Sequence, residues 1–322
     1  MADEGSHIFC DLSLSRRLEK AEGRSSVEFV KARAKVFPES GAAWLEAAGC
    51  DATFDGVASP VTQTFGLGMF ETPKAADVEL VEEFFRGRGA PVFHEVSPLA
   101  DPALLGLLNG RGYEPAEFTS VMFRPLSAGA PAAARRNEAV SVRVVGGGEH
   151  EVWAQTSARG WSEAGFGDFM LGMAQVSARR ADALSFLAEL DGLPVATGAL
   201  SVCEGVALLA GASTVPEARG RGAQNALLDA RLRHAAAQGC DLAMMCAEPG
   251  SASQRNAERQ GFRIAYTRTK WQLDAPPGES RRLALALFAR LDAGDVDGAL
   301  ALLADDATWW IAGGPDTPGA GT

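Results

Sequence analysis

The chain has 322 residues, 47% of them hydrophobic, and a formal net charge of −11 at pH 7. This length predicts two domains or slightly more, and the acidic balance argues against a nucleic-acid backbone as the main partner, because such binding rests on phosphate neutralisation by Lys and Arg. No apolar run approaches the roughly twenty residues that span a bilayer, and the polar first residues do not resemble an export signal. We therefore expect a cytoplasmic protein that binds neither nucleic acid nor membrane.

The cysteines and histidines follow no pattern of a disulfide framework or a metal site. The five cysteines are odd in number and include no Cys-x-x-Cys pair, which fits a reducing compartment. The four histidines show no ligand spacing with one another or with the cysteines. We therefore expect no structural metal, and the sequence leaves the oligomeric state open.

The first 126 residues predict alternating strands and helices. An Ala-, Gly- and Pro-rich stretch follows, which has too little apolar bulk to pack, so residues 127–139 are assigned to a linker. The expected elements before it are a strand at 61–70, a helix at 75–87, a strand at 91–96, a helix at 101–110 and a strand that begins near Tyr113.

Residues 140–273 predict a complete α/β domain with the order β-α-α-β-β-β-α-β-α-β. The turns at Asp191-Gly192 and Glu204-Gly205 each separate two apolar runs, which is a strong hairpin signal. The expected elements are a strand at 140–145, a helix from about 149, a helix at 167–179, strands at 183–190, 195–202 and 206–215, a helix at 223–238, a strand at 241–246, a helix at 251–260 and a strand at 262–273.

The most informative motif joins the third strand of this meander to the helix 223–238. Gly220 and Gly222 let backbone N–H groups approach an anion, and Arg219 and Arg221 supply positive charge. The helix N-terminus adds unpaired N–H donors and the positive end of its dipole. A Walker loop would require a Gly-Lys-Ser/Thr ending, and a dinucleotide fingerprint fits poorly. The junction therefore predicts a pyrophosphate site.

This junction resembles the acetyl-CoA signature of the GNAT superfamily of N-acetyltransferases, Gln/Arg-x-x-Gly-x-Gly/Ala. The first five positions fit and Gln224 departs; its side chain would narrow the space beside the phosphates or donate a hydrogen bond to one of them. The element order and the Gly261-Phe262 pair also resemble the family. The resemblance implies an α/β (α+β) fold, with a mixed, mostly antiparallel central sheet flanked by helices. It also implies direct transfer of an acetyl group from acetyl-CoA, the co-substrate, to an amine.

The first 126 residues resemble a degenerate copy of the same domain, which would make the chain a tandem GNAT protein. Residues 109–123 parallel residues 259–271; the alternative is coincidence between two α/β segments. In place of the phosphate turn this copy has Glu71-Thr72-Pro73-Lys74, with a carboxylate and no glycine, so we expect it not to hold coenzyme A. Its expected roles are to cover the edge of the second sheet, to form one wall of the acceptor cleft, or both.

The resemblance also implies which residues contact acetyl-CoA. The strand before the turn would pair with the pantetheine arm at Ser213, Thr214 and Val215, and the turn would take the pyrophosphate. Ser253 and Asn256 on the following helix remain as hydrogen-bond partners for the sulfur or the pantetheine. The residues of the turn are Arg219, Gly220, Arg221, Gly222, Ala223 and Gln224.

Acetyl transfer needs an acid for the departing thiolate and a base for the amine. Family members commonly place a tyrosine four residues before the terminal glycine of the last helix, where this chain has Ala257. Tyr266 is the fallback acid, with an ordinary sheet residue as the alternative. Glu248 is the first candidate for the base, and water relays can serve instead. Further candidates for the base are Glu163, Asp168 and Glu189.

Acceptor selectivity is expected in the glycine-rich segment 159–169, which carries Trp161, Phe166 and Phe169. Flexible hinges and aromatic faces suit an amine in a hydrophobic cleft. The alternative is that these rings fill the core between helix and sheet.

The last part of the chain begins with a second expected linker, residues 274–280. Residues 281–322 resemble the opening third of a polyketide-cyclase-like domain, with helices expected at 281–291 and 296–304 and a strand-like run at 307–312. These residues are too few to bury a core alone, and no catalytic role is assigned to them.

Together these features favour an acetyl-CoA-dependent N-acetyltransferase that acts on the primary amine of a small molecule. Two alternatives stay open. The first is a non-catalytic acetyl-CoA-binding regulatory module, suggested by Ala257 and Gln224. The second is an acyltransferase that uses another acyl-CoA.

Overall fold

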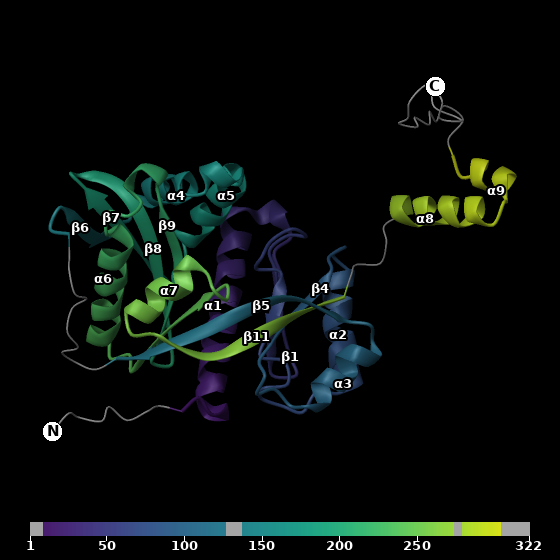
Figure 1. The fold of residues 1–322 in the computed structure, drawn as a ribbon, viewed down its shortest axis with the longest axis horizontal. Coiled ribbons are helices and arrows are strands. Elements are labelled where there is room, and N and C mark those ends of the chain that lie inside the picture. Colours follow the sequence, from purple (N-terminus) through teal and green to yellow (C-terminus); the bar gives the residue numbers. More distant parts are fainter. Residues whose placement is uncertain (1–8, 127–136, 274–278, 304–322) are drawn as a thin grey trace. The chain divides into compact units, whose positions relative to one another are not determined.

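The computed structural model describes residues 9–126, 137–273 and 279–303 (Figure 1). The chain divides into two compact units, Met1–Leu273 and Asp274–Thr322. The expected linkers 127–139 and 274–280 lie largely outside the described residues. No helix among the described residues is long and apolar enough to cross a membrane.

The first unit is built on one 11-stranded sheet, in the order β1-β2-β3-β4-β11-β5-β10-β9-β8-β7-β6. Its strands are β1 (Ala43–Ala47), β2 (Cys50–Phe54), β3 (Gln63–Phe65), β4 (Val92–Val96), β5 (Glu114–Pro125), β6 (Val140–Val144), β7 (Ala183–Leu190), β8 (Leu193–Cys203), β9 (Val206–Thr214), β10 (Leu242–Ala247) and β11 (Arg263–Leu273). Its α-helices are α1 (Leu12–Val36), α2 (Ala75–Arg86), α3 (Ala103–Gly110), α4 (His150–Arg159), α5 (Gly167–Ser177), α6 (Ala223–Ala237) and α7 (Ala252–Arg259).

The sheet contains the same pattern twice. Each half begins with an antiparallel meander, β1-β2-β3 in the first and β7-β8-β9 in the second. A helix follows, then a strand parallel to the third strand of the meander, and then a shorter helix. The connecting helices are α2 and α3 in the first half and α6 and α7 in the second. This correspondence supports the predicted tandem arrangement.

The two halves are joined because each places its last strand beside the other half. β11 pairs with β4 of the first half, whereas β5 pairs with β10 of the second, and β5 and β11 pair with each other. Figure 1 shows these two long strands running across both halves. The two segments that the sequence treats as separate domains therefore share one sheet, and neither half has an exposed edge at the junction.

Helices cover both faces of the sheet. α1, α4 and α5 lie on one face, where α1 contacts strands of both halves, and α6 and α7 cover the other face of the second half (Figure 1). α2 and α3 pack over the first half in a separate apolar cluster. The hairpin signals are confirmed: Asp191 and Gly192 have φ of 53° and 77°, and Leu190 pairs with Leu193.

The first half differs from the prediction in three respects, one of which is that β1 and β2 were not predicted. The predicted strand 61–70 is shorter, since β3 ends at Phe65 and the chain turns at Gly66 and Gly68, whose φ values of 82° and 74° are incompatible with a strand. The 25-residue helix α1 was not predicted. Its buried face includes Ser15, Glu19 and Gly23, so it does not show a continuous apolar stripe.

In the second unit, the described residues 279–303 form the helices α8 (Glu279–Asp292) and α9 (Val296–Leu300). The Asp295 carboxylate caps α9, accepting a hydrogen bond from the Gly298 N–H at 3.0 Å. The strand-like run 307–312 lies outside the described residues.

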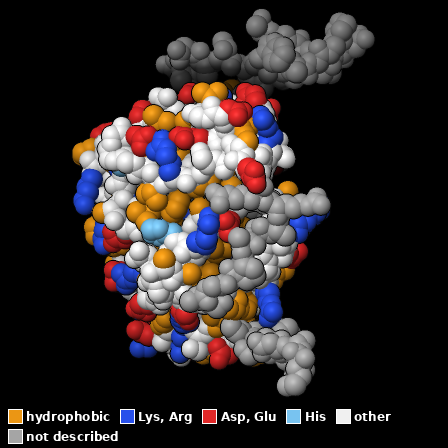
Figure 2. Space-filling model, turned by 90° about the vertical axis from the view of Figure 1, so that its left-hand side faces the viewer, with side chains coloured by type: hydrophobic (Ala, Val, Ile, Leu, Met, Phe, Trp, Pro, Cys, Tyr) orange, Lys and Arg blue, Asp and Glu red, His pale blue; other side chains and the backbone are white. Residues whose placement is uncertain are grey.

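On the face of the molecule in Figure 2, Lys and Arg side chains are interspersed with Asp and Glu side chains.

Candidate functional site

The candidate site begins where two parallel strands of the second half separate. β9 and β10 pair at three positions, the last of which is Leu208 with Met244. β9 nevertheless continues to Thr214 and β10 to Ala247. Beyond the last pair, the edge of β9 no longer has a neighbouring strand on this side.

A β-bulge shapes β9 within this gap. Thr197 pairs with Ser213 and Ala199 pairs with Ala210, so two residues of β9 face one residue of β8. One of them, Gly211, has φ of 61°, and a Cβ there would lie 3.3 Å from Ala199 Cβ. Residues 210–212 are exposed. The bulge therefore presents β9 backbone to the open gap.

The glycine turn after β9 leads into an uncapped helix N-terminus. Gly220 and Gly222 have φ of 74° and 88°, which residues with a Cβ rarely adopt. Gly222 is the N-cap of α6, and no side chain forms a capping hydrogen bond there. The first-turn N–H groups of α6 and its dipole are therefore available to an anion, as the sequence predicts.

Two adjoining cavities follow this backbone. The larger, of about 840 Å³, extends from the end of α4 along the turn. The smaller, of about 280 Å³, reaches toward Leu209, Ser253 and Ala257. Both are lined by Ala212, Ser213, Thr214, Gln224, Asn225 and Asn256. We call them together the coenzyme cavity, and both Ser253 and Asn256 line it.

The side chains of the turn have partners in this structure. Arg219 Nη1 lies 2.6 Å from the Glu163 carboxylate, and its Nη2 donates to the Gly160 carbonyl at 2.9 Å. Gln224 Nε2 donates to the Ser213 carbonyl at 2.7 Å and to Thr214 Oγ1 at 2.9 Å. The glutamine thus ties the end of β9 to the start of α6, rather than turning its amide toward the phosphate position.

The three predicted pantetheine residues do not share one environment. Ser213 and Thr214 line the coenzyme cavity. Val215 is 3% exposed, and its N–H donates to the Val195 carbonyl at 2.9 Å. The Val215 N–H is therefore committed to β8, whereas Ser213 and Thr214 line the cavity, with the Ser213 carbonyl already accepting from Gln224.

The predicted acid and base lie outside the coenzyme cavity. Tyr266 is buried, and its hydroxyl donates to Glu19 Oε1 at 2.8 Å, toward α1. Burial holds the pKa of Tyr266 well above its usual range. Glu248 is exposed after β10 and does not line the cavity. These placements argue against both sequence-based assignments, whereas Ala257 does line the cavity, where the family pattern predicts a tyrosine.

The three aromatic residues that were predicted to contact the acceptor also do not lie around a single cavity. Trp161 lines the coenzyme cavity beside Gly160. Phe166 and Phe169 are 58% and 42% exposed and line neither the coenzyme cavity nor the cavity described next. The segment 159–169 therefore does not gather its three rings around one ligand.

A third cavity, of about 410 Å³, lies on the α1 face of the sheet, and we call it the acceptor cavity. It shares Leu209 with the coenzyme cavity and is also lined by Gly211 of the β9 bulge, so the two cavities meet beside the bulge. The sequence prediction missed its residues because α1 supplies one wall. That wall consists of Glu22, Ser25, Ser26 and Phe29.

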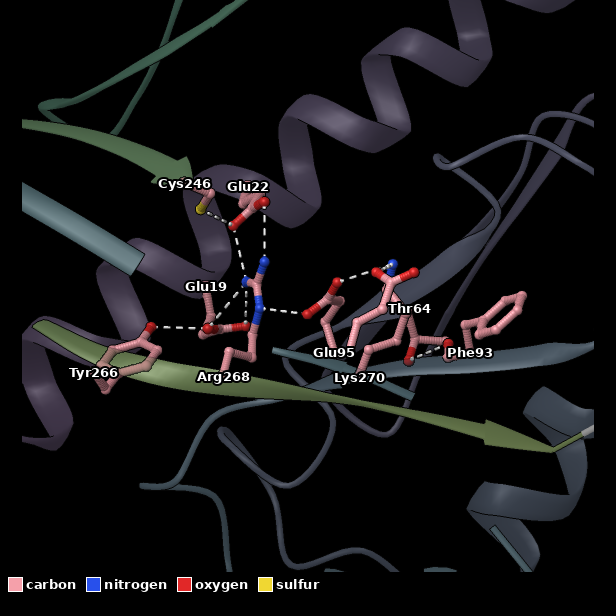
Figure 3. A network of polar contacts seen from close by, with 10 residues as sticks. Glu19, Glu22, Thr64, Phe93, Glu95, Cys246, Tyr266, Arg268 and Lys270 are labelled. Carbon is pink, nitrogen blue, oxygen red and sulfur yellow. Dashed lines mark hydrogen bonds and ion pairs between the residues drawn. The ribbon is translucent and has the colours of Figure 1, made fainter. Parts of the chain in front are cut away.

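A buried charged network underlies this cavity (Figure 3). Arg268 on β11 is 1% exposed and pairs with Glu19, Glu22 and Glu95 at 3.3, 2.8 and 2.7 Å. Burial raises the pKa of Glu19, and the positive charge of Arg268 reduces this increase. Cys246 Sγ donates to Glu22 Oε2 at 3.2 Å, and burial holds the pKa of this thiol well above its usual range.

The corresponding turn of the first half is closed. Leu67 and Met69 are 1% and 2% exposed, so they fill the space after β3. The Asp77 carboxylate accepts from the Lys74 N–H at 2.9 Å, which places a negative charge at the start of α2. A negative charge at this position disfavours a phosphate group at the start of α2.

Residues 150–262 match the model of the acetyltransferase (GNAT) family. This segment is a GNAT domain. It contains the β9 bulge, the glycine turn and the whole lining of the coenzyme cavity. No curated protein is a significant sequence match to the chain.

Solved structures resemble the fold of this chain over most of its length, beyond the residues that match the family model. A GCN5-related N-acetyltransferase from Kribbella flavida matches with a TM-score of 0.56 at 18% identity, covering 80% of this chain and 97% of that one. A conserved protein of unknown function from Staphylococcus epidermidis matches with a TM-score of 0.51 at 9% identity, covering 76% and 98%. These two show a shared fold. A tandem GNAT protein from the clavulanic acid biosynthesis pathway has a TM-score of 0.48 at 15% identity, covering 64% and 69%.

Proposed function

We propose that the chain transfers an acetyl group from acetyl-CoA directly to the primary amine of a small molecule. The observation that carries this proposal is the junction of β9 and α6, where a bulged strand with one unpaired edge runs into a glycine turn and an uncapped helix. A strand edge suits the amide groups of a pantetheine arm, and the helix start suits a pyrophosphate.

The residues of the coenzyme cavity divide this binding between them. The backbone of Ser213 and Thr214 would pair with the pantetheine, and the N–H groups from Gly222 onward would hold the pyrophosphate. Arg221 is an exposed residue of the turn that lines neither cavity, and it would add positive charge near the phosphates. Ser253 and Asn256, across the gap on α7, can donate hydrogen bonds to the sulfur or to the pantetheine.

The reaction needs no covalent enzyme intermediate. The amine nitrogen attacks the thioester carbonyl, so that a C–N bond forms as the C–S bond breaks. The amine gives up its proton to water, and the thiolate gains one. Because Ala257 offers no proton and Tyr266 is held at α1, we assign the thiolate proton to water, with Ser253 or Asn256 as a hydrogen-bond partner. A thiol is acidic enough for its anion to leave without a strong acid.

Thermal unfolding with and without acetyl-CoA tests the binding step. Ligand at a hundred times its dissociation constant should stabilise the folded state by about 2.7 kcal/mol. Arg221→Glu should remove that shift, because it places a negative charge at the phosphate position. Lys74→Glu is the matched control at the start of α2 and should leave the shift unchanged. Retained affinity in Arg221→Glu would refute the phosphate assignment.

Release of free thiol across a panel of amines tests the catalytic step. The buried Ala257 favours one alternative, a module that binds acetyl-CoA without turnover. Binding without thiol release for any amine would support that module. Release with another acyl-CoA in preference to acetyl-CoA would support the second alternative, a different acyltransferase.

A further inference from the structure

The acceptor cavity is formed jointly by the two halves of the sheet. α1, which belongs to the first half, supplies Glu22, Ser26 and Phe29, and the second half supplies β9, β10, α4 and α5. The volume of about 410 Å³ falls within the range of small-molecule sites.

Most of the lining of this cavity is apolar. Phe29 and Trp153 provide aromatic faces, and Met170 and Met173 provide flexible side chains that adapt to the shape of an apolar group. Arg180 is the cation of the lining, and its Nε donates to Asp182 Oδ1 at 3.0 Å. This cation is therefore matched by its own carboxylate.

Glu22 is the carboxylate of the lining, and it stands at the gap between the strands. Its neighbour Cys246 lies on β10 beyond the last β9–β10 pair. Arg268 donates to Glu22 Oε1 at 3.1 Å and to Oε2 at 2.8 Å, which fixes the orientation of the carboxylate. A carboxylate has about four acceptor positions. The bonds from Arg268 and Cys246 account for three, so a donor in the cavity can use the remaining one.

The charges around Arg268 favour a cationic or hydrogen-donating ligand at Glu22. Arg268 is shared by Glu19, Glu22 and Glu95, and Lys270 approaches only Glu95 of the three, at 3.6 Å, so the positive charge that faces Glu22 is divided among three carboxylates. An amine that donates to Glu22 would add a further positive partner to these carboxylates. Such a partner is most favourable in a site shielded from water.

We propose that the acceptor is a small primary amine attached to an apolar body, and that Glu22 of the first half binds its nitrogen. The apolar body lies against Phe29, Met170 and Met173, and the nitrogen is directed to the bulge that the two cavities share. This inference rests on the proposed acetyl transfer and names its substrate class. It also gives the degenerate half a role in recognising the acceptor.

Equilibrium binding tests the proposal without requiring turnover. The probes are 2-phenylethylamine, 2-phenylethanol, which lacks the amine, and ethanolamine, which lacks the apolar body. We expect the full chain to bind 2-phenylethylamine at least about tenfold more tightly than either of the other two, the ratio expected for one hydrogen bond to a charged group. Glu22→Gln should reduce that affinity about tenfold. Equal affinity of the three probes would overturn the proposal.

Matched variants separate recognition from folding. Glu28→Gln removes another α1 carboxylate, which pairs with Lys31 at 2.6 Å, and should leave binding unchanged. Ser26→Phe, at the cavity wall, should block the apolar body while the thermal shift with acetyl-CoA persists. Unchanged binding in both Glu22→Gln and Ser26→Phe would place the amine elsewhere.

Turnover then distinguishes this inference from the proposed function. Glu22→Gln should lower kcat/KM for 2-phenylethylamine about tenfold and leave the KM for acetyl-CoA unaltered. Glu22-dependent binding without thiol release would support the amine site and refute the acetyl transfer. Thiol release that is faster with ethanolamine, or indifferent to Glu22→Gln, would support the transfer and refute the amine site.

Discussion

His94 makes the stability of this protein depend on pH in a way that can be calculated. It lies on β4 with no exposed surface, with Nδ1 2.7 Å from Thr64 Oγ1 and Nε2 3.0 Å from Tyr113 Oη. Burial lowers the pKa of His94 to about 4, whereas an unfolded histidine has a pKa of about 6.5. Between these values the unfolded chain binds a proton that the folded chain does not.

The sign follows from this difference in proton binding. The contribution of His94 to stability is full above about pH 6.5 and falls as the pH drops toward 4, because protonation favours the unfolded state. The complete loss corresponds to about 3 kcal/mol, of which about 2 kcal/mol is lost between pH 7 and pH 5.

Urea denaturation of the wild type and of His94→Gln at pH 7, 6 and 5 measures this contribution. Glutamine does not titrate, and the other ionisable groups are common to both proteins. The stability difference between them should therefore shrink by about 2 kcal/mol from pH 7 to pH 5. A difference that stays constant over this range would show that His94 titrates normally in the folded protein and would refute the reasoning.

Three further predictions concern other parts of the fold. Gly160→Ala should lower the free energy of unfolding, measured by urea denaturation, by about 1–3 kcal/mol and should weaken acetyl-CoA binding. The reason is that the added Cβ would meet the Ser213 side chain and lie 3.0 Å from the Thr214 backbone. An unchanged midpoint of urea denaturation would contradict this. Asp77→Ala should cost about 1 kcal/mol by removing the cap of α2, and it should not change the thermal shift with acetyl-CoA. A chain that ends at Leu273 should keep the melting temperature and acetyl-CoA affinity of the first unit, because residues from 274 onward form a separate unit; loss of either would show a dependence on the second unit.

Local signals in the sequence determined the GNAT-like half of this protein. The glycine turn and the hairpin at Asp191-Gly192 both depend on backbone geometry that a few adjacent residues decide, and each is found where expected. The element boundaries of residues 140–273 are correspondingly close to the predicted ones. The site residues within this segment that belong to the coenzyme turn were predictable for the same reason.

The tertiary structure alone decided how the two halves combine and what surrounds the acceptor cavity. No local pattern specifies that β11 pairs with β4 and β5 with β10, because strand neighbours are chosen by contacts far apart in sequence. α1 was not predicted because it buries Glu19 against Arg268, a partner 249 residues away in the chain, so its face toward the sheet does not appear apolar. The same long-range pairing places Glu22 at the acceptor cavity and holds Tyr266 away from the coenzyme cavity.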